Sequence, residues 1–182
     1  MSEGELLQLQ KARKLNITED DYFKIISRKT AALVSACTAC GARSVTEDPE
    51  AILLMKDFGE NIGIAFQIRD DLLDYEGTGL TGKTVGNDIK EKKITLPLIH
   101  ALEQSANSKK RHILGIVKNR EKTKTDINEV ISFVSDNGGM EYARLKMNQY
   151  RDKALAILDS YPDSDVKDSL KEFVYYTTSR KK

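Results

Sequence analysis

Apolar residues recur at helical spacing along almost the whole chain, whereas the alternation typical of strands is scarce. The longest apolar stripe follows Asp48-Pro49, a cap residue with proline at the first helical position, and it contains Ile52, Met55, Phe58, Ile62 and Phe66. The stripe predicts one long helix that extends to about Tyr75. Gly59 and Gly63 leave two bare spots on one face of this helix, where a neighbouring helix can approach closely. We therefore predict that it is a central element of a bundle.

Start and stop signals divide the rest of the chain into further helices. Thr18, followed by three acidic residues, predicts the start of a helix that ends at Gly41. A polar loop is then predicted around Gly77, Gly79, Gly82 and Gly86. Another helix is expected from near Asp88 to Leu102, with Pro97 kinking it or lying near an end. The remaining helices are predicted over 113–118, 127–135, 140–160 and 166–177. The expected fold class is all-α: one helical-bundle domain over residues 1–182.

Composition excludes several classes of protein. The 182 residues are 40% hydrophobic and 31% charged, as expected of a globular chain that can bury a core. The net charge of +1 gives no strong field, so nucleic acid is not an expected partner. The sequence has no apolar run of 18 residues, and its M-S-E-G-E start does not resemble a signal peptide. We expect a soluble, cytoplasmic protein.

Two cysteines, Cys37 and Cys40, form a C-x-x-C pair inside the apolar stretch A-A-L-V-S-A-C-T-A-C-G-A. Such a pair suits redox chemistry or zinc binding. A second ligand pair is missing, however, and His100 and His112 do not have metal-ligand spacing to it. We therefore expect two small buried residues on one helix face, in a protein from a reducing compartment.

The segment F-Q-I-R-D-D-L-L-D, residues 66–74, concentrates negative charge on one helix face. Its polar side chains stand at i, i+3, i+4 and i+7 and belong to Gln67, Asp70, Asp71 and Asp74. Three carboxylates so close together repel each other unless a cation lies between them. Mg²⁺ suits this face, because it takes oxygen ligands and combines one or two carboxylates with substrate phosphates. Alone, D-D-x-x-D is more typical of an ordinary solvated acidic face than of a metal site, so the neighbouring motifs must decide.

Three further motifs accompany the acidic segment. Lys29-Thr30 precedes it, and Gly82-Lys83 and then D-I-K-E-K-K-I-T-L-P, residues 88–97, follow it. In order and approximate spacing these motifs resemble the trans-prenyltransferase (polyprenyl synthetase) family, whose second aspartate-rich motif is F-Q-x-x-D-D-x-x-D. The opening G-E-L-L-Q-L also resembles the helix before K-T in long-chain members. The resemblance implies a helical bundle of the isoprenoid synthase type, here its carboxy-terminal half.

The resemblance also implies how the acidic residues act. Asp70 and Asp71 would bind Mg²⁺ that bridges the diphosphate of an allylic prenyl substrate. Asp74 would lie near the same ion or its waters. Asp88 would contact the ligands of the metal rather than the metal itself.

The basic and neutral residues of the matching motifs have implied roles as well. Lys29 and Lys83 would bind the diphosphate directly, and Lys93 would be a further diphosphate contact. Thr30 and Gln67 would lie beside the nascent allylic cation, where their dipoles stabilise it without attacking it. For the lysines, an ordinary solvated surface position is the alternative.

The reaction implied is the condensation of isopentenyl diphosphate with an allylic prenyl diphosphate, which gives a longer all-trans polyprenyl diphosphate. Ionisation of the allylic substrate leaves a highly charged diphosphate, which metal ions and lysines stabilise electrostatically. No protein nucleophile is needed, and the sequence contains no Ser-His-Asp or Cys-His arrangement. The opening and the L-P-L-I segment favour bacterial long-chain, octaprenyl-type synthases, whose lipophilic product would pass to a membrane.

The family's first D-D-x-x-D motif, with its R-R-G segment, and the early G-G-K-x-x-R region are absent from these residues. We therefore expect that the chain alone is inactive. It would be a fragment, a truncated product or one subunit of a split enzyme, associating as a homodimer or with the missing half. The alternatives are a non-catalytic helical interaction module of a heteromeric synthase and, less consistent with the K-T and G-K motifs, a terpene cyclase.

The basic end of the chain, Arg180-Lys181-Lys182, allows two interpretations. Basic tails approach the second substrate's diphosphate in some relatives. We favour a frayed terminus.

Overall fold

The computed structural model describes residues 2–14, 16–76 and 85–180, and every regular element within these ranges is helical. The elements in chain order are α1 Ser2–Lys14, α2 Glu19–Ile26, η1 Ser27–Ala31, α3 Ala32–Arg43, α4 Pro49–Glu76, α5 Asn87–Lys90, α6 Leu96–Gln104, α7 Asn107–Lys118, α8 Lys124–Asp136, α9 Gly139–Asp159 and α10 Asp165–Ser179. The predicted all-α class and the long central helix are confirmed. In the part of the chain that the structure describes, no helix has the length and apolar character needed to cross a membrane.

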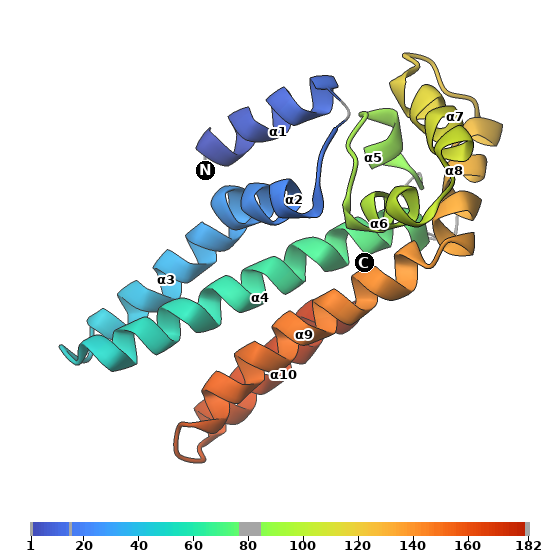
Figure 1. Ribbon diagram of the computed structural model, residues 1–182. Helices are drawn as coiled ribbons and strands as arrows, with labels where there is room; N and C mark the ends of the chain where they lie inside the picture. Colours follow the sequence, from blue (N-terminus) through green and yellow to red (C-terminus); the bar gives the residue numbers. More distant parts are fainter. Residues whose placement is uncertain (1, 15, 77–84, 181–182) are drawn as a thin grey trace.

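The long helix α4 organises the bundle. It packs against α3 and η1 on one side and against α9 and α10 on the other (Figure 1). Helices α1 and α2 lie over the second half of α4, and α5 to α8 gather beyond its end. The second half of α4 is therefore surrounded by elements from both ends of the sequence.

The face of α4 opposite its acidic residues is anchored in the main hydrophobic core. Ile68 and Leu72 are fully buried there, and Tyr75 is nearly so. This core also includes apolar side chains from α2, α6, α8 and α9. The acidic residues therefore stand on a helix whose orientation is fixed by apolar packing.

The helix predicted to begin after Thr18 starts where expected. The Asp21 backbone N–H donates to the Thr18 hydroxyl at 3.2 Å, and the Thr18 N–H donates to the Asp21 carboxylate, also at 3.2 Å. The helix is not uniform, however, because Ser27–Ala31 form a π-helical turn before α3 continues to Arg43. Such turns insert an extra residue and often mark functional sites. This turn carries Lys29 and Thr30.

The two bare spots on α4 do permit a close helix crossing, as predicted. A Cβ atom on Gly59 would lie 2.8 Å from the Ser35 Cα, and one on Gly63 would lie 2.7 Å from the Ala31 Cα. Both distances are shorter than side-chain carbon atoms tolerate. Glycine is therefore required for η1 and α3 to pack this closely on α4.

The prediction that Cys37 and Cys40 are buried is wrong, because both are exposed. Instead, α3 packs on α4 through the face that carries Ser35. The Ser35 hydroxyl is buried and donates to the Lys56 carbonyl at 2.9 Å. Apolar character alone misidentified the packed face, since a small polar residue next to Gly59 fits the crossing better.

The single helix predicted from Asp88 to Leu102 is also wrong, because α5 ends at Lys90 and α6 starts at Leu96. Lys92 takes a left-handed conformation with φ of 60°, and Thr95 is extended. Pro97 lies in the first turn of α6, where its missing N–H costs nothing. The expectation that this proline lies near a helix end is confirmed.

Candidate functional site

A cavity of about 110 Å³ lies between α1, α2, the second half of α4 and the segment 93–95 that precedes α6. Its lining includes carboxylates, lysines and two side-chain amides, which belong to Asp71, Asp88, Lys11, Lys29, Lys93, Gln8 and Gln67. The structure thus brings together residues that are far apart in the sequence, and all of them except Lys11 were singled out for their motifs. The mixture of anionic and cationic groups suits a ligand that is bound partly through a metal ion and partly through direct contacts.

The carboxylate of Asp71 lies deepest on the acidic face. Its Oδ2 atom accepts a hydrogen bond from the Tyr22 hydroxyl at 2.7 Å, and Tyr22 itself is buried. Burial raises the pKa of Asp71 well above its usual range; the neighbouring carboxylates of Asp88 and Asp70 raise it further, although the Tyr22 hydrogen bond opposes this. The negative charge here is poorly compensated by the described residues. A cation at this position would stabilise it.

Asp88 contributes a second carboxylate to the cavity. Burial raises its pKa, and the nearby carboxylate of Asp74 adds to the effect, whereas Lys93 opposes it. The Lys93 ammonium lies 3.5 Å from Asp88 and 2.6 Å from Glu91. Although burial opposes the change, these ion pairs raise the pKa of Lys93. Lys93 is therefore held as a cation at the wall of the cavity.

Thr30 and Gln67 lie side by side, as the resemblance implies. The Thr30 hydroxyl donates to the Gln67 side-chain carbonyl at 3.1 Å. The π-helical turn and the face of α4 are thus joined at the point where both enter the site. A role for this pair beside an allylic cation stays a prediction.

Lys29 is held at the cavity by the amino-terminal helix. Its ammonium donates to the Gln8 side-chain carbonyl at 2.9 Å and lies 3.5 Å from the Glu5 carboxylate. Gly4 makes this approach possible, because a Cβ atom there would lie 2.7 Å from the Lys29 backbone nitrogen. The other predicted diphosphate contact, Lys83, lies outside the described residues.

Asp74 has a different environment from the other two aspartates of the motif. Its carboxylate accepts the backbone N–H groups of Asn87 and Asp88, both at 3.0 Å. The backbone carbonyl of Asp74 also accepts the N–H of Gly86 at 3.0 Å. Asp74 therefore fixes the start of α5 and with it the position of Asp88. Its role as a metal ligand stays a prediction.

Asp70, the first aspartate of the motif, forms an ion pair with the guanidinium of Arg180. The same guanidinium lies 4.2 Å from the centre of the Phe66 ring. The expectation of a frayed terminus is therefore wrong for Arg180, which is docked on α4. Lys181 and Lys182 lie outside the described residues.

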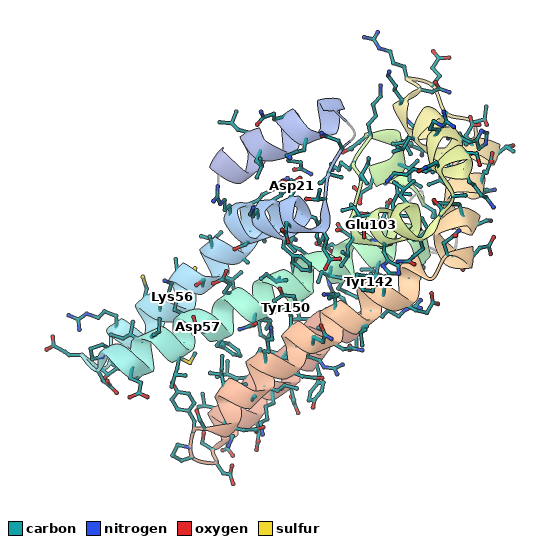
Figure 2. The ribbon with its side chains drawn as sticks, in the orientation of Figure 1. Asp21, Lys56, Asp57, Glu103, Tyr142 and Tyr150 are labelled. Carbon is teal, nitrogen blue, oxygen red and sulfur yellow. The ribbon has the colours of Figure 1, made fainter. Side chains whose placement is uncertain are left out.

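Sequence reasoning missed two residues of the site, Lys11 and Tyr22. Lys11 lines the cavity and forms an ion pair with Asp21 at 2.7 Å, where α1 meets α2 (Figure 2). The hydrogen bond from Lys11 lowers the pKa of Asp21. Lys11 follows Gln8 by three residues, so helical spacing places both on one face of α1 and could have identified it. Nothing in the sequence indicates that Tyr22 pairs with Asp71, because their contact depends on the tertiary fold.

No three carboxylate, imidazole or thiol groups among residues 2–14, 16–76 and 85–180 are arranged to hold a metal ion by themselves. Mg²⁺ does not require such a cage, since it commonly keeps several waters and takes one or two carboxylates together with phosphate oxygens. Asp71 and Asp88 offer oxygen donors at one cavity, and burial raises the pKa of both carboxyl groups. The donor set therefore fits Mg²⁺ bound jointly with a phosphate ligand.

The arrangement of helices in this chain is also found in known proteins. The crystal structure of a geranylgeranyl pyrophosphate synthase from Bacteroides thetaiotaomicron matches 98% of this chain with a TM-score of 0.90 and 40% identity, over 59% of its own length. A polyprenyl synthase from Caulobacter crescentus CB15, solved with calcium and isoprenyl diphosphate, matches the whole chain with a TM-score of 0.90 and 34% identity, over 56% of its own length. The fold is thus that of the prenyl diphosphate synthases.

The sequence comparisons agree with the structural ones. The polyprenyl synthetase family model matches residues 1–134, and the chain belongs to this family. The octaprenyl diphosphate synthase of Escherichia coli (strain K12) is 34% identical over 171 residues, which are 93% of this chain and 53% of that protein. A short chain isoprenyl diphosphate synthase of Methanothermobacter thermautotrophicus is 33% identical over 92% of this chain and 51% of its own length. The chain spans about half the length of these curated relatives.

Proposed function

We propose that this chain supplies the site that binds the diphosphate of an allylic substrate in a trans-prenyl diphosphate synthase. The reaction would join isopentenyl diphosphate to an allylic prenyl diphosphate and give a longer all-trans polyprenyl diphosphate. The observation that carries the proposal is that Asp71 and Asp88 line the same cavity as Lys29 and Lys93. Family membership and the relatives' names support it.

Different residues of this chain would have different roles in the ionisation of the allylic diphosphate. Asp70 and Asp71 would hold Mg²⁺, with Asp74 near the same ion and Asp88, which lines the cavity, beside its ligands. The ion supplies positive charge to the departing diphosphate. Lys29 and Lys93 would contact diphosphate oxygens directly and stabilise the charge that develops on them. The Thr30 hydroxyl and the Gln67 amide, joined by their hydrogen bond, would present dipoles to the allylic cation.

Inorganic pyrophosphate with Mg²⁺ tests the site without requiring turnover. We expect the two together to raise the melting temperature of the chain by more than either alone, and calorimetry to detect binding. Asp71→Asn and Lys29→Ala should each weaken binding by about tenfold or more, since each removes a charged contact. Asp152→Asn is the matched control, because that carboxylate pairs with Arg151 away from the cavity. Equal binding by wild type and Asp71→Asn would contradict the proposal.

We also propose that the 182 residues do not elongate prenyl diphosphates at a significant rate by themselves. The sequence has one D-D-x-x-D segment, whereas the family's site is built from two aspartate-rich motifs that face each other. The measurement is product formation from farnesyl diphosphate and isopentenyl diphosphate by the purified chain. Protein-dependent elongation that is lost in Asp71→Asn would refute this statement and support the assigned site.

A further inference from the structure

Arg69, the residue directly before the two adjacent aspartates of the acidic motif, holds the end of the last helix. The Arg69 side chain is buried, and its Nε and Nη2 atoms donate to the Arg180 carbonyl at 2.9 and 2.7 Å. Its Nη1 atom donates to the Glu76 carboxylate at 2.7 Å, and Glu76 also pairs with Arg144 at 2.7 Å. A rigid, doubly anchored guanidinium thus fixes the backbone of Arg180 against α4.

The side chain of Arg180 is held on the acidic face as a consequence. Its guanidinium pairs with Asp70 and covers the Phe66 ring. Its Nε atom is buried and has no hydrogen-bond partner among the described residues. A buried donor without a partner is unfavourable, so the Arg180 conformation depends on the Asp70 ion pair and on the backbone anchor.

We propose that Arg180 is a latch that competes with a metal ion for Asp70, and that Arg69 is the positioning residue that holds this latch in place. The inference rests on the proposed function, because it takes Asp70 to be part of the Mg²⁺-diphosphate site. Arginine keeps its charge at any accessible pH. A divalent cation that approaches Asp70 is therefore repelled by the positive charge of Arg180 until the guanidinium moves away.

Binding of a metal ion without diphosphate separates this competition from direct contacts with a phosphate ligand. Mn²⁺ is a suitable probe because its binding to the whole chain can be measured by electron paramagnetic resonance. Arg180→Ala is expected to tighten Mn²⁺ binding by about threefold to fivefold. A change of this size corresponds to the free energy that a partly exposed ion pair contributes. Arg180→Lys should give a smaller change, since it keeps the charge. Arg151→Ala, which removes a guanidinium paired with Asp152, is the matched control and should change nothing.

A second measurement reports the latch in the absence of any ligand. The Arg180 backbone N–H donates to the Tyr176 carbonyl at 3.0 Å, so its hydrogen exchange reports the order of this helix end. Asp70→Asn and Arg69→Gln should each accelerate this exchange by about fivefold or more, and added Mn²⁺ should accelerate it in wild type. If Arg69→Gln fails to fold, Asp70→Asn, which alters a half-exposed side chain, still provides the test.

The outcomes separate the latch from the function on which it rests. Mn²⁺ binding that is unchanged or weaker in Arg180→Ala would overturn the latch while leaving the metal site intact. If neither wild type nor Arg180→Ala binds Mn²⁺, with or without added pyrophosphate, the proposed function fails and the competition with it. This holds even where hydrogen exchange shows that Arg69 and Asp70 order the helix end. Exchange that is unaffected by Asp70→Asn would overturn the claim that the ion pair holds Arg180.

Discussion

The two halves of α4 serve different purposes although they form one continuous helix. In the first half, Phe58 and Ile62 pack with apolar residues of α9 and α10, while Gly59 and Gly63 admit η1 and α3 at backbone contact. In the second half, the polar residues between 67 and 76 have partners in η1, α2, α5 and α9 and at Arg180, just after α10. Close shape complementarity therefore governs how the first half packs, whereas charged and polar contacts distinguish the second half.

This contrast predicts how substitutions act. Changes in the first half alter helix packing, and their effects should appear in the free energy of unfolding. Changes in the second half remove charged groups that burial leaves poorly compensated, so their effects should appear mainly in ligand binding. Substitutions in the first half that change ligand binding alone, or substitutions of cavity carboxylates in the second half that change only the free energy of unfolding, would contradict this division.

The largest effect is expected from overfilling the helix crossing. Gly59→Ala should lower stability by about 1–3 kcal/mol, because the new methyl group meets the backbone of Val34 and Ser35 at 2.8 Å. Gly115→Ala is the matched control, since a Cβ atom there meets nothing within 4 Å. That control should gain about 0.5–1 kcal/mol from helix propensity. Chemical denaturation measures both, and equal changes in the two variants would contradict the close crossing.

A smaller loss is expected at Asp74, which lies in the second half but has a structural environment. Asp74→Ala leaves the N–H groups of Asn87 and Asp88 without their acceptor and should cost about 1–2 kcal/mol, as removal of a helix cap does. Asp70→Ala is the comparison, because its partners are the side chains of Arg180 and Gln67 and not backbone N–H groups, and the loss should be below about 1 kcal/mol. If Asp74→Ala is neutral in denaturation yet abolishes Mg²⁺-pyrophosphate binding, Asp74 acts as a ligand and not as a cap.

The sequence predicted the parts of this molecule that depend on local pattern. Thr18 with Asp21 defined a helix start, and Gly59 with Gly63 indicated a close crossing; both depend on residues near each other in the chain. Spacing alone also placed Gln67, Asp70 and Asp71 on one face of α4. The family resemblance then indicated which distant segments meet them.

The failures came from contacts between distant segments. The pairing of Tyr22 with Asp71 and the docking of Arg180 on Asp70 join residues separated by 49 and 110 positions. No periodicity encodes such contacts. Cys37 was assigned to the wrong face because hydrophobicity does not show that a glycine on the neighbouring helix selects Ser35.

Neutralising the deepest carboxylate should change stability by less than Gly59→Ala or Asp74→Ala, and in the opposite direction. Because burial raises the pKa of Asp71, the folded chain binds a proton at higher pH than the unfolded chain, and stability falls as pH rises above about 4. Asp71→Asn removes this loss and keeps an oxygen acceptor for the Tyr22 hydroxyl. At pH 7 the variant should be more stable by on the order of 1 kcal/mol, and the difference should vanish below about pH 4. Denaturation at both pH values measures this, and a loss of stability at pH 7 would mean that Asp71 supports the fold and not the ligand.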